Sequence, residues 1–330
     1  MANQVQPKLI IHGGAGSSLK GKGGLEAVRR SLRDIVQQTY AALTDGKPAE
    51  AVVALGCRLL EDEPRFNAGT GSVLQSDGQV RMSAAIMVGD RQRFSGVINV
   101  GQVKNPIDLA RLLQDSPDRV LSETGAALLA REQGIPIHSP LTDLRLQEWL
   151  QERQGNFDAS MANVVAESLA GSGAEPMAKP IADTSDEAGR GTIGVVVRDS
   201  QGRLAVGTST GGKGFERIGR VSDSAMPAGN YATPTSAISC TGIGEDIIDE
   251  CLAPRIAVRV TDGYTLEAAF ARSCAEAQHN QRDLGAIGLD HTGAIAWGKT
   301  SDILLAAYHT GAEIGDTLEV PAGLQTGGCP

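Results

Sequence analysis

The sequence predicts an α/β (α+β) fold of four layers, in which two antiparallel β-sheets are stacked between two layers of helices. Apolar residues recur at helical spacing in several segments, which predicts amphipathic helices. Two hairpin patterns, around Asp199-Ser200-Gln201-Gly202 and around Asp290-His291-Thr292-Gly293, have nearly continuous apolar strands. Strands of that kind are covered on both faces, so each sheet needs a second sheet on one side and helices on the other.

In the amino half, a short apolar strand over Lys8–Ile11 runs into the glycine-rich segment His12-Gly13-Gly14-Ala15-Gly16. Apolar positions three and four residues apart then predict two helices, the second with a proline where a first helical turn tolerates it. After a polar stretch over 63–71, Ser76-Asp77-Gly78 between two apolar segments, 72–75 and 80–88, predicts a hairpin. The predicted helices span Leu25–Leu43, Pro48–Glu61, Pro106–Gln114, Leu121–Gln133 and Thr142–Arg153.

The composition changes between Gln154 and Arg190, where serine, glycine, alanine, proline and acidic residues follow one another with little periodicity. This predicts a flexible linker, whether one with a function of its own or an ordinary connection between domains. Beyond it come the strands Thr192–Val197 and Leu204–Ser209 of the first hairpin, and Leu284–Leu289 and Ala294–Trp297 of the second. Helices over Glu245–Val260 and Leu266–Asn280 lie between the hairpins and can cover them.

Composition and charge exclude several classes of function. The 330 residues carry a net charge of −9 without a dominant cluster of lysine and arginine, which argues against a nucleic-acid partner. We find no signal peptide and no apolar run of the roughly 20 residues that a membrane helix needs. The five cysteines are scattered and form no CxxC pair, so neither a zinc site nor a disulfide framework is predicted. A cytoplasmic protein with reduced thiols is expected.

The junction Gly189-Arg190-Gly191-Thr192 joins the linker to a buried strand and is the most informative feature of the sequence. If the bond between Gly191 and Thr192 were cut, Thr192 would gain a free amine beside its own hydroxyl. An α-amino group has a pKa of about 8 and can serve as the general base for that hydroxyl. By itself, however, Thr192 is equally a β-branched residue that starts a strand.

Three further segments supply groups that such a nucleophile needs. Thr210 ends the returning strand, so its hydroxyl could bond the nucleophile or relay a proton. The glycine-rich turn around Thr241 and Gly242 offers backbone N–H groups suited to an oxyanion, although it could equally be a capped strand-to-helix turn. Arg220 and Asp223 could clamp a carboxylate and an ammonium, or form only a surface ion pair.

Taken in order, these segments resemble the plant-type L-asparaginases, also called isoaspartyl (β-aspartyl) peptidases. The amino half agrees, and the resemblance covers nearly the whole chain except the linker. The segments that carry it are Ile11–Gly16, Leu59-Leu60-Glu61 with Phe66-Asn67-Ala68-Gly69, Gly191-Thr192-Ile193-Gly194, Ser209-Thr210-Gly211-Gly212, Gly219-Arg220-Val221-Ser222-Asp223-Ser224 and Ser239-Cys240-Thr241-Gly242-Ile243-Gly244-Glu245.

The resemblance implies the αββα sandwich of the N-terminal-nucleophile hydrolases. The chain would cut itself between Gly191 and Thr192 into an α subunit, 1–191, with the linker at about 154–191, and a β subunit, 192–330. The two subunits would form one domain, and two such pairs an (αβ)₂ heterotetramer. No cofactor would be needed for catalysis, while a sodium ion would be ringed by the backbone carbonyls of Leu60, Glu61, Glu63, Phe66, Ala68 and Thr70.

The resemblance also assigns roles within the site. Thr192 would be the nucleophile, assisted by Thr210. The hydroxyl of Thr241 and the N–H of Gly242 would stabilise the oxyanion and contact the substrate. The remaining substrate-binding residues would be Arg220, Asp223, Gly244 and Asn67.

Departures from the family's usual pattern concern the substrate pocket and leave the nucleophile intact. Two acidic positions are absent from Met82–Gly89, Ser222 stands where glycine is usual, and Ser224–Asn230 differs from the commoner form. The sequence thus predicts an autoprocessed threonine amidohydrolase that releases L-aspartate from β-aspartyl dipeptides and L-asparagine.

Two alternatives remain beside this prediction. A glycosylasparaginase would share the fold, although the missing signal peptide and unpaired cysteines argue against it. A phosphate- or nucleotide-binding protein is suggested by His12–Gly16, but no Gly-x-Gly-x-x-Gly opens a helix there and the chain has no P-loop.

Overall fold

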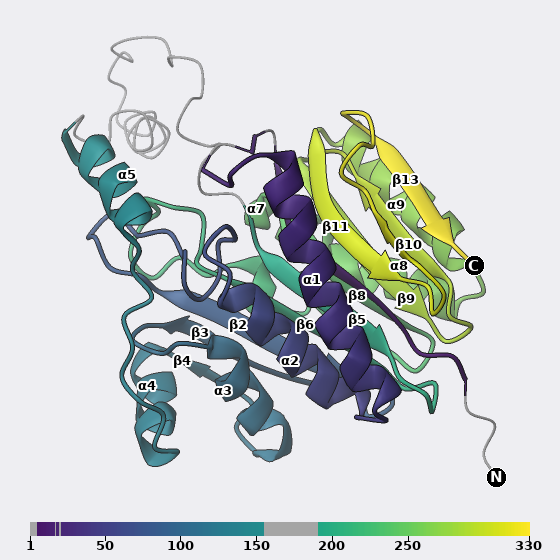
Figure 1. The fold of residues 1–330 in the computed structure, drawn as a ribbon, viewed down its shortest axis with the longest axis horizontal. Coiled ribbons are helices and arrows are strands. Elements are labelled where there is room, and N and C mark those ends of the chain that lie inside the picture. Colours follow the sequence, from purple (N-terminus) through teal and green to yellow (C-terminus); the bar gives the residue numbers. More distant parts are fainter. Residues whose placement is uncertain (1–4, 17, 20, 155–190) are drawn as a thin grey trace.

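Figure 1 shows a computed structural model of the chain, in which two β-sheets lie face to face with helices on their outer sides. The structure describes residues 5–16, 18–19, 21–154 and 191–330, so the predicted linker falls on 155–190, outside the described residues. The predicted four-layer fold is confirmed.

The larger sheet has the strand order β12-β11-β1-β5-β6-β2-β3-β4 and the smaller one β13-β10-β9-β8-β7. The two predicted hairpins are β5–β6 in the larger sheet and β9–β10 in the smaller. The strands are β1 Lys8–Gly16, β2 Met82–Val88, β3 Arg93–Val100, β4 Val120–Ser122, β5 Ile193–Arg198, β6 Leu204–Thr210, β7 Asn230–Ala232, β8 Ser236–Gly242, β9 Leu284–Asp290, β10 Ile295–Lys299, β11 Ile303–His309, β12 Ile314–Asp316 and β13 Gln325–Cys329.

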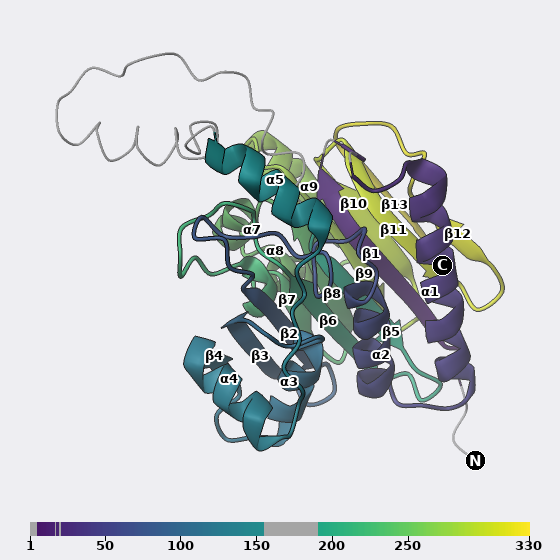
Figure 2. The ribbon, with the colours of Figure 1, turned by 60° about the vertical axis from the view of Figure 1, so that its left-hand side comes forward.

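Helices cover the outer face of each sheet, as Figure 2 shows from a second direction. The first four helices lie against the larger sheet, and α8 and α9 lie against the smaller one. The helices are α1 Leu25–Thr44, α2 Ala49–Glu61, α3 Pro106–Leu112, α4 Glu123–Glu132, α5 Asp143–Gln154, α7 Gly244–Glu250, α8 Leu252–Thr261 and α9 Leu266–His279.

Three apolar clusters fill the spaces between the layers, and β5 contributes to two of them. Its residues Ile193, Val195 and Val197 pack toward the helices, whereas Val196 lies in the cluster between the sheets. This alternation follows from the two-residue period of a strand. Because both faces are buried, the strand that starts just after Thr192 is held rigidly from both sides.

The hairpin predicted around Ser76-Asp77-Gly78 is wrong. A tight turn does form there, with the Gln75 N–H donating to the Gln79 carbonyl oxygen at 2.9 Å, but residues 72–75 form no strand. The N–H of Val73 instead donates to the side chain of Asn67. β2 pairs with β3 and β6, and no pattern in the sequence predicts β3.

Two other elements differ from their predicted form. The helix predicted over Glu245–Val260 is broken at Cys251, whose φ of 47° is left-handed and separates α7 from α8. The helix predicted from Leu121 starts at Glu123, because residues 120–122 form β4. β4 pairs with β3 in parallel, so the larger sheet is not entirely antiparallel.

The two halves of the chain are interleaved within the larger sheet. β5 lies between β1 and β6, and β6 in turn pairs with β2. A cut before β5 would therefore leave both pieces joined by continuous ladders of backbone hydrogen bonds. In the described part of the chain, no helix is both long and apolar enough to cross a membrane.

Candidate active site

Thr192 immediately precedes β5 and is buried, with 7% of its surface exposed. Because Ile193 pairs with Ser209 on β6, Thr192 lies across from Thr210. The Thr192 hydroxyl donates to Thr210 Oγ1 at 3.3 Å, and its Oγ1 lies 3.4 Å from Ser224 Oγ. The predicted pairing of the two threonines is therefore present, while Ser224 is a neighbour to which sequence reasoning gave no role.

His12 holds the backbone of Thr192 rather than its hydroxyl. Its Nδ1 lies 2.9 Å from the Thr192 carbonyl oxygen, and its Nε2 lies 2.8 Å from Ser239 Oγ. Burial lowers the pKa of His12 to about 3, so the ring is neutral, with its proton on Nδ1, where a carbonyl can accept it. A neutral ring fixed in this way positions Thr192 and does not accept its hydroxyl proton.

The glycine-rich segment after His12 passes directly against Gly191. It belongs to β1, which has a bulge between His12 and Ala15. A Cβ on Gly14 would lie 2.6 Å from the Gly191 Cα, and its φ of 126° also requires glycine. These glycines allow close contact between two backbones. That role argues against a phosphate-binding loop.

Arg220, Asp223 and Gly244 meet in one place, as predicted. A Cβ on Gly244 would lie 2.6 Å from Arg220 Nη2 and 2.9 Å from Asp223 Oδ1, so the glycine leaves a gap between the two charged side chains. The Arg220 guanidinium donates to both carboxylate oxygens of Glu245, at 3.0 and 2.9 Å. A substrate carboxylate at Arg220 would therefore have to share or displace Glu245.

Asp223 is almost fully buried and incompletely satisfied. The Ser222 hydroxyl donates to its Oδ1 at 3.0 Å, whereas its Oδ2 has no hydrogen-bond partner among the described residues. Burial raises the pKa of Asp223 to about 7, although the Arg220 charge and the Ser222 hydroxyl act in the opposite direction. A substrate ammonium beside Oδ2 would supply the missing partner and favour the carboxylate.

Filling the gap at Gly244 is expected to weaken substrate binding. A Gly244→Ala variant should raise KM roughly tenfold or more, because its methyl group would occupy space between Arg220 and Asp223. Gly125→Ala is the matched control, since a Cβ at that helical glycine meets only ordinary contacts at 3.8 Å. Steady-state kinetics on a β-aspartyl dipeptide measures both variants, and an unchanged KM in Gly244→Ala would contradict the placement of the substrate.

Thr241 and Gly242 lie at the end of β8, beside the same site. The Thr241 Oγ1 accepts a hydrogen bond from the Ala15 N–H at 3.1 Å, which leaves its own proton available for donation. Gly242 has a φ of 127°, and a Cβ there would lie 2.6 Å from the Asp283 carbonyl oxygen, so glycine is required. Their role toward an oxyanion stays a prediction.

A small cavity of about 20 Å³ collects most of the predicted residues. A single buried water needs roughly 10–15 Å³ of such space, so in the uncut chain the cavity has room for about one water and is far too small for an amino acid. The residues that line it are Gly191, Thr192, Thr210, Gly212, Lys213, Arg220, Ser222, Asp223, Gly242, Ile243 and Gly244.

Asn67 lies beside this cavity without lining it. Its backbone N–H donates to the Gly191 carbonyl oxygen at 3.2 Å, and its side-chain amide donates to the carbonyl of Gly212 at 2.7 Å. The residue therefore connects the two segments that flank Thr192 and Thr210. Its predicted contact with substrate stays a prediction.

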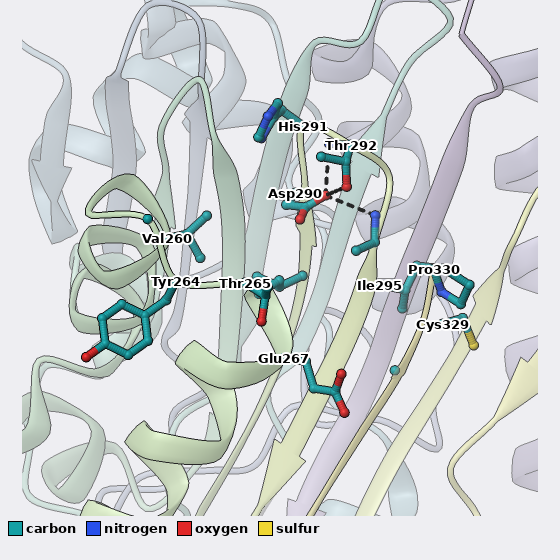
Figure 3. A pocket seen from close by; sticks show the side chains of 14 residues that line it. Val260, Tyr264, Thr265, Glu267, Asp290, His291, Thr292, Ile295, Cys329 and Pro330 are labelled. Carbon is teal, nitrogen blue, oxygen red and sulfur yellow. Dashed lines mark hydrogen bonds between the residues drawn. The ribbon is translucent and has the colours of Figure 1, made fainter.

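A larger pocket, of about 510 Å³, lies at the opposite end of the smaller sheet (Figure 3). Residues on its wall include Tyr264, Glu267, His291 and Cys329. β8 and β9 run antiparallel, so Gly242 pairs with Leu284 at one end of the ladder, while Asp290 lies at the far end. None of the predicted site residues lines this pocket.

Two of the carbonyls predicted to ring a sodium ion, those of Glu61 and Phe66, lie close to glycines of the loop after α2, and the ring itself stays a prediction. A Cβ on Gly69 would lie 2.4 Å from the Glu61 carbonyl oxygen, and one on Gly71 would lie 2.8 Å from that of Phe66. The carbonyls thus crowd around two glycines with left-handed φ values of 53° and 105°. Among the described residues, no group of three or more His, Cys, Asp and Glu side chains could hold a metal, so an ion here would depend on carbonyl oxygens, which suit hard cations.

Comparison with known proteins shows the family to which this chain belongs. An asparaginase family model matches residues 5–319. The chain is 67% identical to an isoaspartyl peptidase/L-asparaginase of Nostoc sp. over 99% of both chains. It is 60% identical to a protein of the same name from Synechocystis sp., over 96% of this chain and 92% of the relative. It is also 33% identical to a plant-type L-asparaginase of Pyrococcus horikoshii, over 91% and 95% respectively. The chain therefore belongs to the asparaginase family.

Proposed function

We propose that this protein cuts its own chain between Gly191 and Thr192 and then hydrolyses β-aspartyl dipeptides and L-asparagine to release L-aspartate. One observation carries the proposal. The Thr192 hydroxyl contacts the hydroxyls of Thr210 and Ser224, and within the described residues no acid, imidazole or amine is hydrogen-bonded to it. The base that it needs is the amine that a cut at Gly191 would free. The names of the relatives from Nostoc sp. and Synechocystis sp. support the substrates.

The reaction follows from the groups around Thr192. Its free amine takes the hydroxyl proton as Oγ1 attacks the side-chain carbonyl carbon of the substrate. The Gly242 N–H and the Thr241 hydroxyl stabilise the oxyanion, and Thr210 holds the nucleophile. The C–N bond breaks as the amine proton passes to the leaving nitrogen. Water then hydrolyses the aspartyl ester on Thr192 and releases aspartate.

Arg220 and Asp223 would hold the α-carboxylate and α-ammonium of the aspartyl group, with Gly244 between them. Both groups belong to the part of the substrate that is the same in asparagine and in β-aspartyl dipeptides. The leaving group therefore points away from them and can vary, which accounts for two substrates in one site.

Mass spectrometry of the purified protein tests the proposal. We expect two fragments that meet at Gly191/Thr192, and release of aspartate from β-aspartyl-leucine that rises with the cleaved fraction. A chain that stays intact under activating conditions would contradict the self-cleavage. A protein that hydrolysed glycosylated asparagine but not β-aspartyl-leucine would instead support the glycosylasparaginase alternative.

The mature protein would consist of an α subunit, 1–191, and a β subunit, 192–330, joined in one sheet and paired as an (αβ)₂ heterotetramer. A cytoplasmic location is part of the proposal, because Cys57, Cys240 and Cys274 are buried free thiols and Cys251 and Cys329 are also unpaired. Light scattering of the cleaved protein would test the assembly, since a particle of one αβ pair would contradict it.

We also propose that the ring of carbonyls around Gly69 and Gly71 binds sodium. Because that loop supplies Asn67 and flanks Gly191, sodium should stabilise the fold. Exchange of sodium for a bulky organic cation should lower Tm by several degrees, and sodium should restore it with a saturating dose response. Equal Tm values in the two salts at one ionic strength would contradict the site.

A further inference from the structure

Lys22 lies beside Gly191, although the two are far apart in the sequence. The Lys22 side chain is buried, with 5% of its surface exposed. Its Nζ is the atom nearest to the position that a Cβ on Gly191 would take, at 3.3 Å. A cationic head group therefore sits against the residue whose carbonyl forms the bond that we propose is cut.

The loop after α2 holds this head group in place. Nζ donates to the Arg65 carbonyl oxygen at 2.9 Å and lies 5.7 Å from the centre of the Phe66 ring, within cation–π distance. The same loop supplies the Asn67 N–H that donates to the Gly191 carbonyl oxygen at 3.2 Å. One segment thus aligns both the ammonium and the scissile carbonyl.

Burial lowers the pKa of Lys22 to about 8, so the side chain is an ammonium below that pH. Arg145 and Glu148 on α5 are the charged groups that act on it, with opposite signs. Glu148 is itself paired with Arg145, at 2.9 Å. In the described portions of the chain, no carboxylate lies within ion-pair distance of Nζ. Because Lys22 is buried away from solvent, its charge is screened weakly and acts strongly on charge that develops nearby.

We propose that Lys22 assists self-cleavage directly, because its ammonium stabilises the negative charge that develops on Gly191. The inference rests on the proposed cut at this bond. Thr192 Oγ1 adds to the Gly191 carbonyl carbon, and the oxyanion forms beside the Asn67 N–H and the Lys22 charge. The C–N bond then breaks, and the hydroxyl proton ends on the Thr192 nitrogen. Water hydrolyses the resulting ester, and Lys22 pairs with the new Gly191 carboxylate.

Glycine at position 191 lets Lys22 lie close to the backbone before Thr192. A side chain at position 191 would meet Lys22 Nζ at 3.3 Å, a separation tighter than most real Cβ contacts. Its next neighbours would be the Gly13 carbonyl oxygen at 3.5 Å and the Asn67 Cβ at 3.6 Å. A glycine therefore lets an ammonium and a backbone both reach the bond to be cut.

The test follows self-cleavage of freshly purified, uncut protein over time by gel and mass spectrometry. Three variants separate charge from hydrogen bonding. Lys22→Met removes both, Lys22→Gln keeps a donor for the Arg65 carbonyl, and Lys22→Arg keeps the charge. We expect cleavage at least tenfold slower in the first two and faster in Lys22→Arg than in Lys22→Gln. Lys47→Met, at an exposed lysine, is the matched control and should cleave at the wild-type rate.

Tm is measured for each variant, so that slow cleavage is attributed to the charge only where the fold is retained. Wild-type cleavage rates in Lys22→Met or Lys22→Gln would overturn the inference while leaving the proposed function in place. So would a folded Lys22→Arg that cleaved no faster than Lys22→Gln. A wild-type chain that never cleaved would overturn the proposed function itself, and this inference with it.

Discussion

A Thr192→Ala variant is expected to remain a single chain and to hydrolyse β-aspartyl-leucine at least roughly 10³-fold more slowly than the wild type. The variant lacks the hydroxyl that attacks in both reactions. Because the alanine would stay in amide linkage to Gly191, it would also lack the free amine that serves as base. One substitution thus removes nucleophile and base together.

Fragment masses measure the loss of self-cleavage, and aspartate release measures the loss of hydrolysis. Thr192→Ser should keep both reactions at reduced rates, because it retains the hydroxyl but lacks the methyl group that restricts χ1. Thr44→Ala, at an exposed threonine at the end of α1, controls for loss of a threonine hydroxyl elsewhere. Aspartate release by Thr192→Ala at the wild-type rate would rule out Thr192 as the nucleophile.

Asp223→Asn is expected to lower kcat/KM by about 10²-fold at pH 8, mainly through KM. Removing one partner of a buried charge pair typically costs 2–5 kcal/mol or more, and the asparagine amide can neither neutralise a substrate ammonium nor balance Arg220. Asp34→Asn, at an exposed position on α1, is the matched control. A kcat/KM in Asp223→Asn equal to that of the wild type would contradict the assignment of Asp223 to the ammonium site.

The pH dependence gives an independent test of Asp223. Because burial raises its pKa to about 7 and the substrate ammonium binds the carboxylate, kcat/KM should fall as pH drops through 7. Deprotonation of the Thr192 amine, with an ordinary pKa near 8, also favours activity at higher pH. As pH falls below 7, log kcat/KM of the wild-type protein should therefore decrease by more than one per pH unit. In Asp223→Asn it should decrease by one per pH unit. Equal slopes in both proteins would contradict the titration of Asp223.

The sequence alone determined the layers and the chemistry of the central hairpin. Apolar periodicity separates strands from helices, because a strand buried on both faces must be nearly continuously apolar. It therefore predicted β5 and β6, and with them the meeting of Thr192 and Thr210 across adjacent strands. It could not predict β3, whose polar Ser95 and Asn99 are buried through contacts with other segments.

Only the tertiary structure decided how the charged groups are arranged around the bond to be cut. Lys22, Gly14 and Gly191 belong to segments remote in sequence, and no local pattern relates a lysine near one helix to a glycine before a strand. Packing between elements also decides that Arg220 pairs with Glu245. In the same way it leaves Asp223 Oδ2 without a hydrogen-bond partner among the described residues. Local periodicity is set by the backbone geometry of each segment, whereas distances between buried polar groups are set by how the segments pack. The Gly191–Thr192 bond could thus be predicted from the chain, but the ammonium beside it could not.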